Sequence, residues 1–264
     1  MKRCCLAAIL AAIFAAGAVA QDRKKLLFIG EVRGFQHDSV SHAAGVLWQL
    51  GHESGLWDTY IRTDSQLLTK KPLEGNARNL EFFDAVFFFT SGSLPMDDQQ
   101  KADLLAFVRD DGKGFLGAHS ASDTFYDWPE YGDMLGAYFD GHPWGGFEAT
   151  VRTEAPDFPA TAHFPCNFRI SDEIYQFGAP YSRDNVRVLL RLEPSSVDLT
   201  IEGVKRTDGD FALAWARDYG RGRVFYSAFG HAEEVWDRED VRKMWLEAVK
   251  WAMGLVEGDA APRR

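Results

Sequence analysis

Apolar runs and amphipathic segments alternate through the first half of the chain. Residues 25–30, 85–89 and 114–118 are mostly apolar at successive positions, which is typical of strands buried on both faces of a parallel sheet. Residues 40–51 repeat apolar side chains at helical spacing up to a glycine, and residues 97–112 do the same after an aspartate that can cap a helix. This alternation predicts an α/β protein with a doubly wound, mostly parallel sheet between two layers of helices.

The second half of the chain is less regular. Residues 147–152 and 186–192 predict strands, which we place at an antiparallel edge of the sheet. Residues 211–215 and 222–227 predict a hairpin, and a last amphipathic helix is predicted over residues 238–253. No internal repeat or low-complexity linker separates these elements, so the chain is expected to fold as one domain.

The first twenty residues have the pattern of an export signal. Two basic residues precede an apolar core, and a small-x-small cleavage site follows at residues 18–20. We therefore expect an exported protein, in the periplasm or outside the cell. Its single domain is predicted over residues 21–256, followed by a flexible polar tail over residues 257–264.

Charge and cysteine content limit the function classes. The formal net charge is −10, and it becomes −12 when Lys2 and Arg3 leave with the signal. Such an acidic chain disfavours nucleic acid and anionic membranes as partners, and we expect no membrane insertion after signal cleavage. Cys166 is the one cysteine beyond the signal, so the mature chain cannot form an intramolecular disulfide.

A histidine follows the third apolar run in a setting typical of catalytic loops. Residues 114–122 end the run in small residues around His119 and Ser120. In α/β proteins, side chains at the carboxyl end of a buried strand lie beside the ligand crevice, and small neighbours permit a sharp turn. Such an elbow usually presents a cysteine or serine nucleophile. Ser120 could serve as a nucleophile with His231 and Glu233, or its hydroxyl could simply bond to the backbone.

Three further histidines lie in segments that should leave strands or form glycine-rich loops. These are His37, His142 and His231. Imidazole serves as acid, base or metal ligand near neutral pH. Each histidine alone is more often structural, but together His119, His142 and His231 form a hypothetical site for zinc or another divalent ion.

Adjacent carboxylates offer a partner for these histidines. Asp172 and Glu173 would point to opposite faces of a strand, so only one of them can enter a given site. We favour Glu173 as the acid, base or ligand. A salt bridge or a helix cap is the structural alternative.

Tryptophans divide into two sets by their spacing. Trp48, Trp215, Trp245 and Trp251 have the periodicity of core residues. Trp128, Trp144 and Trp236 fall in predicted loops near histidines or acids, where an indole could stack on a sugar ring.

Several motifs in sequence order resemble those of the ThuA-like (trehalose-utilisation) family, which has a class I glutamine amidotransferase-like fold. The resemblance runs from about residue 25 to 254, and its landmarks are residues 34–39, 117–121, 135–139, 141–143, 171–175, 214–226 and 230–231. It implies a flavodoxin-like three-layer α/β/α sandwich with a mostly parallel sheet. It also implies a small carbohydrate as substrate, such as trehalose or a 3-keto glycoside.

The same resemblance places residues 117–121 over the Gly-x-Cys-x-Gly elbow of true amidotransferases. His119 then stands where the thiol nucleophile would be, and His231 and Glu233 stand where those enzymes carry a His-x-Glu pair. Without the thiol, glutamine hydrolysis through a thioester is excluded. We instead expect hydrolysis, elimination or isomerisation of an oxidised or simple glycoside.

The sequence therefore yields a ranked set of hypotheses. The first is a carbohydrate enzyme, the second is a non-catalytic sugar-binding protein, and the third is a serine esterase that uses Ser120. The site residues expected are, for catalysis, His119, His231, Glu173 and Ser120; for substrate, His37, Trp128, Trp144, Tyr175 and Glu233; and for metal, His119, His142 and His231.

Overall fold

The computed structural model describes residues 22–75 and 78–263. The predicted export signal over residues 1–20 lies outside these ranges. Among the described residues, no helix is both long enough and apolar enough to cross a membrane.

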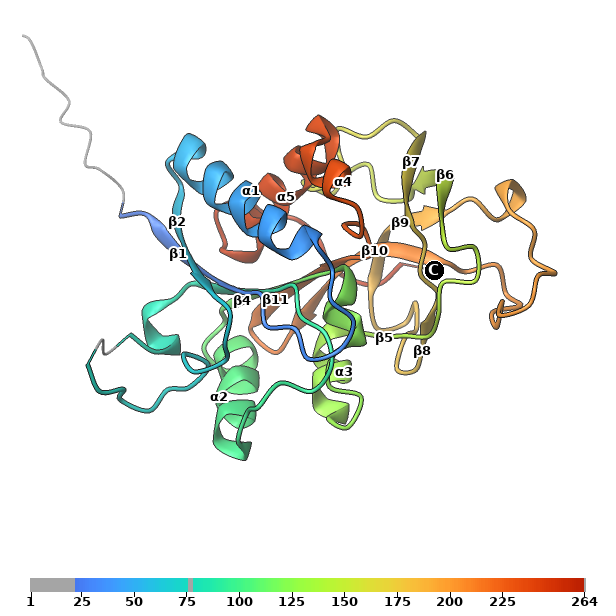
Figure 1. The fold of residues 1–264 in the computed structure, drawn as a ribbon. Helices are drawn as coiled ribbons and strands as arrows, with labels where there is room; N and C mark the ends of the chain where they lie inside the picture. Colours follow the sequence, from blue (N-terminus) through green and yellow to red (C-terminus); the bar gives the residue numbers. More distant parts are fainter. Residues whose placement is uncertain (1–21, 76–77, 264) are drawn as a thin grey trace, which may run out of the picture.

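A nine-stranded sheet forms the centre of the described part of the chain (Figure 1). Its first five strands run parallel in the spatial order β2 (Trp57–Arg62), β1 (Lys24–Ile29), β3 (Ala85–Phe88), β4 (Gly114–Ala118) and β11 (Gly222–Ser227). The sheet then continues with antiparallel pairings through β10 (Ala212–Tyr219), β9 (Arg187–Leu192), β6 (Gly146–Thr153) and β7 (Asn167–Glu173). A separate small sheet pairs β5 (Tyr138–Phe139) with β8 (Phe177–Gly178).

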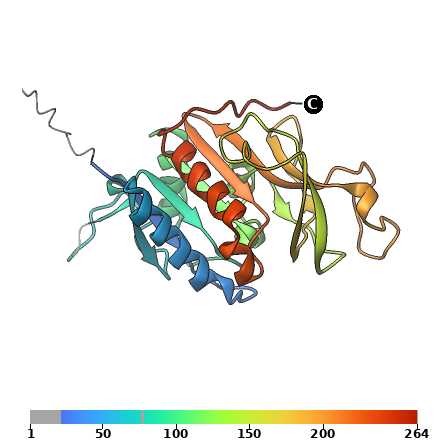
Figure 2. The ribbon, with the colours of Figure 1, turned by 90° about the horizontal axis from the view of Figure 1, so that it is seen from above.

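Helices cover both faces of the parallel strands (Figure 1). One face carries α1 (Ser39–Ser54), α4 (Glu233–Asp237) and α5 (Glu239–Ala252), and Figure 2 shows α1 and α5 side by side over the strands. The other face carries α2 (Asp98–Arg109) and α3 (Pro129–Leu135). A short 3₁₀ helix, η2 (His119–Asp123), follows β4 directly.

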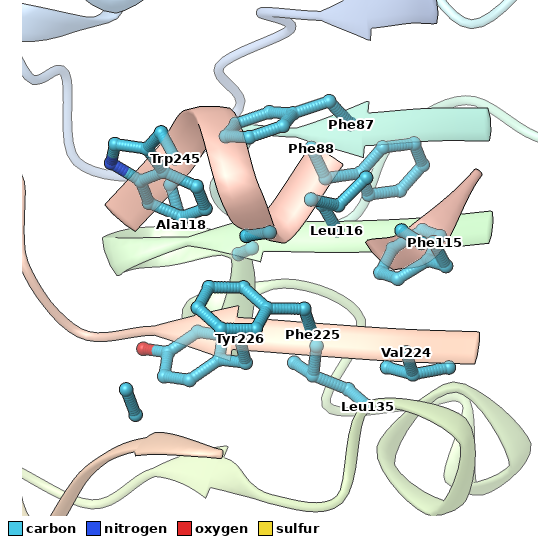
Figure 3. Close-up of a cluster of buried hydrophobic side chains, with 14 of the residues drawn as sticks. Phe87, Phe88, Phe115, Leu116, Ala118, Leu135, Val224, Phe225, Tyr226 and Trp245 are labelled. Atoms are coloured by element: carbon cyan, nitrogen blue, oxygen red, sulfur yellow. The ribbon is translucent and has the colours of Figure 1, made fainter. Parts of the chain in front are cut away.

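Aromatic side chains fill both layers between sheet and helices (Figure 3). Neighbouring residues of β3 point to opposite faces, as strand geometry requires. Phe87 packs on Trp245 of α5 with ring centroids 5.0 Å apart, whereas Phe88 packs on Phe115 and on Tyr131 of α3. The parallel strands are therefore buried on both sides, which explains why their sequences are apolar without alternation.

The predicted flavodoxin-like α/β fold is confirmed, with a larger antiparallel part than the expected edge. The predicted stop of the first helix at Gly51 is wrong, because α1 continues to Ser54 and ends at Gly55 in the left-handed conformation. Gly51 serves packing instead: a Cβ there would lie 2.6 Å from Trp57 Nε1. Sequence analysis also missed β2, whose burial is only partial.

Two tryptophans differ from their predicted surroundings. Trp48, expected in the core, is 51% exposed and stacks on His52, because it lies at the border of the apolar stripe whose centre is Leu47. Trp236, expected in a loop, lies in α4 and is fully buried against Trp245.

The segment predicted as a flexible tail makes contacts with the body of the protein through residue 263. Trp251 Nε1 donates to the Gly258 carbonyl at 3.0 Å, and Arg223 pairs with Glu257 at 2.9 Å. Ala260 is buried. These contacts place the segment along the ends of α5 and β11.

Candidate functional site

The elbow after β4 positions His119 by backbone geometry. His119 has a φ of 44°, a left-handed conformation that is uncommon for a residue with a side chain. Gly117 permits the turn to pack tightly, because a Cβ there would lie 3.0 Å from Leu135 and 3.1 Å from Ala121. Small residues around His119 are therefore required by the close approach of neighbouring atoms, as the sequence indicated.

Two hydrogen bonds fix the His119 ring. Its Nδ1 lies 2.7 Å from the Ala228 carbonyl, which can only accept, so Nδ1 carries the proton. In the neutral ring Nε2 then bears a lone pair, and it accepts the hydroxyl of Tyr175 at 2.7 Å. His119 is fully buried, so this lone pair faces other protein groups.

Three histidines and one carboxylate converge at the carboxyl ends of the strands. His37 follows β1, His119 follows β4, His231 follows β11, and Glu173 ends β7. One potential ligand atom from each of these four residues lies within 4.8 Å of the others. Glu173 Oε2 is 3.5 Å from His119 Nε2 and 3.2 Å from His231 Nδ1. We call His37, His119, Glu173 and His231 the histidine–glutamate cluster.

Electrostatics divide the cluster into one neutral histidine and one ion pair. Burial, followed by repulsion from His119 and His231 in their protonated forms, lowers the pKa of His37 to about 3, so this ring is neutral at neutral pH. Burial works to raise the pKa of Glu173, but interactions with His119 and His231 in their protonated forms outweigh burial and hold that pKa below the ordinary value. The same interaction with Glu173 raises the pKa of His231.

Asp172 supports the cluster from the opposite face of β7. Its carboxylate accepts the backbone N–H of Gly230 at 2.7 Å and that of Ala232 at 3.3 Å, on either side of His231. Burial raises the pKa of this carboxyl, and the nearby His119 acts in the other direction. The two adjacent carboxylates thus make different contacts: Asp172 holds a loop, while Glu173 contacts the histidines.

The residues of the cluster fit a divalent transition metal. With metal–ligand bonds of about 2.1 Å, the ligand atoms of a tetrahedral site lie about 3.4 Å apart. The distances from Glu173 Oε2 to His119 and His231 are 3.5 and 3.2 Å. His37 contributes a buried Nδ1 that has no hydrogen-bond partner among the described residues. Three imidazoles and a carboxylate are a donor set suited to zinc.

A small cavity of about 180 Å³ adjoins the cluster. Its lining comprises Phe35, His37, Asp123, Phe139, His142, Glu173 and Tyr175. This volume is below the roughly 300–1,000 Å³ of pockets for drug-sized ligands, so it suits a single small ring. His119 and His231 are absent from the lining; His119 is fully buried, whereas the His231 side chain is 38% exposed.

His142 does not take the place predicted for it among the metal ligands. Its Nδ1 lies 3.5 Å from Glu173 Oε1, on a loop where its side chain is 45% exposed. In the compact group of four, His37 occupies the third histidine position. Sequence spacing could not distinguish the two, because the choice depends on how the loops after β1 and β5 close over β7.

The predicted sugar-stacking tryptophans are not part of the cavity. Trp128 is buried against Phe125, and Trp144 donates its indole N–H to the Asp198 carbonyl while packing on Phe211. Phe35 and Phe139 line the cavity instead. The sequence predicts these indoles in loops that could contact a sugar, but each packs on the protein itself or donates a hydrogen bond to it.

The predicted serine triad is not assembled. Ser120 is buried and does not line the cavity. Glu233 is exposed on α4, and His231 lies against Glu173 instead. The described residues therefore give the serine-esterase alternative no support.

Sequence analysis missed three cavity residues. Phe35 and Phe139 lie within motifs that carried the family resemblance, but nothing in their spacing indicated a ligand. Asp123 lies four residues after His119, and its place on the 3₁₀ helix brings it to the cavity. A carboxylate that close to the elbow was the available signal.

The fold and the site together define a flavodoxin-like α/β protein with a histidine–carboxylate cluster at the carboxyl ends of its parallel strands. The model of the ThuA family, described as trehalose utilisation, matches residues 25–252. The chain therefore belongs to the ThuA family, as its motifs indicated. No match was found among curated proteins.

Solved structures share this fold at low sequence identity. A ThuA-like protein from Bacteroides uniformis is 24% identical, with 91% of this chain and 95% of that chain covered and a TM-score of 0.70. A ThuA-like protein from Parabacteroides merdae is 18% identical, with coverage of 88% and 90% and a TM-score of 0.66. A cytoplasmic protein from Salmonella typhimurium is 14% identical, with coverage of 86% and 99% and a TM-score of 0.54. At these identities the likeness establishes the fold alone.

Proposed function

We propose that this protein is an exported enzyme of carbohydrate utilisation that acts on trehalose-like 3-keto glycosides with the help of a divalent metal ion. The observation that carries the proposal is the convergence of His37, His119, Glu173 and His231 within 4.8 Å. Family membership supports the choice of a carbohydrate as substrate, because the family description is trehalose utilisation.

Two of the four residues of the cluster already have the protonation state that metal binding needs. A ligating histidine must be neutral at the ligating nitrogen and a ligating carboxylate must be ionised. His37 is neutral because its pKa is about 3, and Glu173 is ionised because its pKa lies below the ordinary value. The bond from His119 Nδ1 to the Ala228 carbonyl directs the Nε2 lone pair to the cluster, as second-shell bonds to metal-ligating histidines do.

The reaction that this site favours is proton transfer next to a ketone. A bound divalent ion would polarise the carbonyl oxygen and so acidify the neighbouring C–H bond. Burial raises the pKa of Tyr175 well above its ordinary value, so its hydroxyl stays protonated. If His119 Nε2 ligated the ion, this hydroxyl would no longer donate to that nitrogen and could donate to a substrate oxygen instead. Loss of the C–H proton leads to elimination, hydration or isomerisation of a 3-keto glycoside.

The cavity is shaped for one sugar ring. Phe35 and Phe139 both line the cavity, and Phe35 is 63% exposed. Aromatic rings bind the C–H faces of sugars, while the polar groups of the lining meet the hydroxyls. The buried His119 acts through its lone pair within the cluster and not by direct contact with a sugar.

The test combines metal analysis with a substrate screen on the purified mature protein. We expect about one equivalent of a divalent ion such as zinc, and turnover of a 3-keto glycoside that a chelator abolishes and added metal restores. His231→Ala and Glu173→Gln should each lose metal and turnover. His52→Gln, an exposed histidine on α1, is the matched control and should lose neither.

Two results would contradict the proposal in different ways. Absence of stoichiometric metal after growth and purification with zinc would refute the metal site. Sugar binding without turnover of any keto glycoside would instead establish the alternative of a non-catalytic sugar-binding protein.

A further inference from the structure

The cavity contains a second carboxyl group that the proposed metal ligands do not include. Asp123 lines the cavity together with Glu173, His142 and Tyr175. It is the last residue of η2, whereas Glu173 is the last residue of β7, so two separate elements each bring a carboxyl group to the same small space.

Hydrogen bonds hold Asp123 in this place. The backbone N–H of Gly92 donates to the Asp123 carbonyl at 2.8 Å, and the Tyr126 hydroxyl donates to Oδ1 at 2.8 Å. Burial raises the pKa of Asp123, against the effect of the Tyr126 hydrogen bond. A larger share of this carboxyl group is therefore protonated at a given pH than for an ordinary aspartate.

None of the other groups described in the cavity is an evident proton donor for the proposed reaction. The histidine–glutamate cluster uses its lone pairs for the ion, and the raised pKa of Tyr175 makes its hydroxyl a poor source of a proton. His142 lies on an exposed loop, with its Nδ1 3.5 Å from Glu173 Oε1. The titratable groups that face Asp123 are Tyr126 beside it, His119 on its own helix, and His37, His142, Glu173 and Tyr175 across the cavity.

We propose that Asp123 is a catalytic residue, the general acid that protonates the departing glycosidic oxygen. This inference rests on the proposed function and names its missing proton donor. A water molecule takes the proton from the carbon next to the ketone, and the electron pair of that C–H bond forms a carbon–carbon double bond. The glycosidic C–O bond breaks, and its oxygen leaves as an alcohol with the proton of Asp123. The proton held by water then returns to Asp123.

The test compares Asp123→Asn with the wild-type protein on two 3-keto glycosides. One substrate has a poor leaving group, a second sugar, and the other has a good leaving group, 4-nitrophenol. Protonation matters only for the poor leaving group, so the variant should lose about 100-fold or more in turnover of the disaccharide and much less on the nitrophenyl substrate. Its metal content should equal that of the wild type, because Asp123 is outside the cluster.

Controls separate a catalytic role from a structural one. Asp127→Asn removes a nearby exposed carboxylate that does not line the cavity and should leave both rates unchanged. Asp123→Ser serves as a second variant if Asp123→Asn does not fold, and the same split between substrates is expected. Equal loss on both substrates, or no loss on either, would overturn the assignment. Wild-type protein that turns over neither substrate would refute the proposed function, and the role of Asp123 with it.

Discussion

Acidification of the metal-free protein should reveal the buried His37 as a loss of stability. The folded protein holds its pKa at about 3, and an unfolded chain has a histidine pKa near 6.5. Between these values the unfolded state binds a proton that the folded state does not, so stability falls as the pH falls. The free energy of unfolding at pH 5 is therefore about 2 kcal/mol lower than at pH 7, because the pKa of His37 differs by about 3.5 units between the folded and unfolded states.

Urea unfolding in the presence of a chelator, at pH 7 and at pH 5, measures this change in the free energy of unfolding. His37→Gln is neutral at both values, so the wild type should lose about 2 kcal/mol more than the variant over this interval. His231 works in the opposite direction, because its raised pKa stabilises the fold at low pH, but both proteins contain it. Equal losses in the wild type and the variant would refute the reasoning that burial keeps His37 uncharged.

Three further substitutions test other parts of the site. Gly230→Ala places a side chain at a φ of 129° and within 2.9 Å of the Trp236 ring. We expect the free energy of unfolding to fall by about 1–3 kcal/mol in a thermal or urea melt. Metal binding should also weaken, because His231 is the next residue and would be displaced. Asp172→Ala leaves two backbone N–H groups without their acceptor and should cost about 1–3 kcal/mol; a cost below about 0.5 kcal/mol would contradict its supporting role. Trp128→Ala should lower the free energy of unfolding by about 3–5 kcal/mol without weakening sugar binding by the folded protein. Phe35→Ala should instead weaken sugar binding in calorimetry and barely change stability. The reverse pattern would contradict the cavity lining.

Much of the fold could be predicted because its strands are buried on both faces. An unbroken run such as 85–89 has few alternatives to a central parallel strand, and the capping box at Asp97 marks the start of α2 in the sequence itself. Prediction was weaker where burial is partial. β2 is only partly buried. The spacing of apolar residues predicts a helix stop at Gly51, but the structure requires a glycine there because Trp57 approaches closely.

The sequence could predict where the histidines of the candidate site lie, but it could not predict the full set of residues that form the site. Loop histidines after apolar runs pointed to the carboxyl edge of the sheet, where His37, His119 and His231 meet. The exchange of His142 for His37 as the third compact histidine followed from loop closure, which no local pattern encodes. The closeness of Asp123 to the elbow is a local signal, but only the turn of η2 brings this residue to the cavity.

The sequence by itself determined the alternation of strands and helices, the family, and the elbow that presents His119 in place of a thiol. These properties depend on local periodicity and on motifs read in order. Only the tertiary structure decided which side chains share one space, that His119 is buried with its Nε2 near Glu173 and Tyr175, and which aromatic rings line the cavity. The physical reason is that ligand geometry and pKa values depend on distances of a few ångströms between residues more than fifty positions apart, and those distances are fixed by packing of the whole chain.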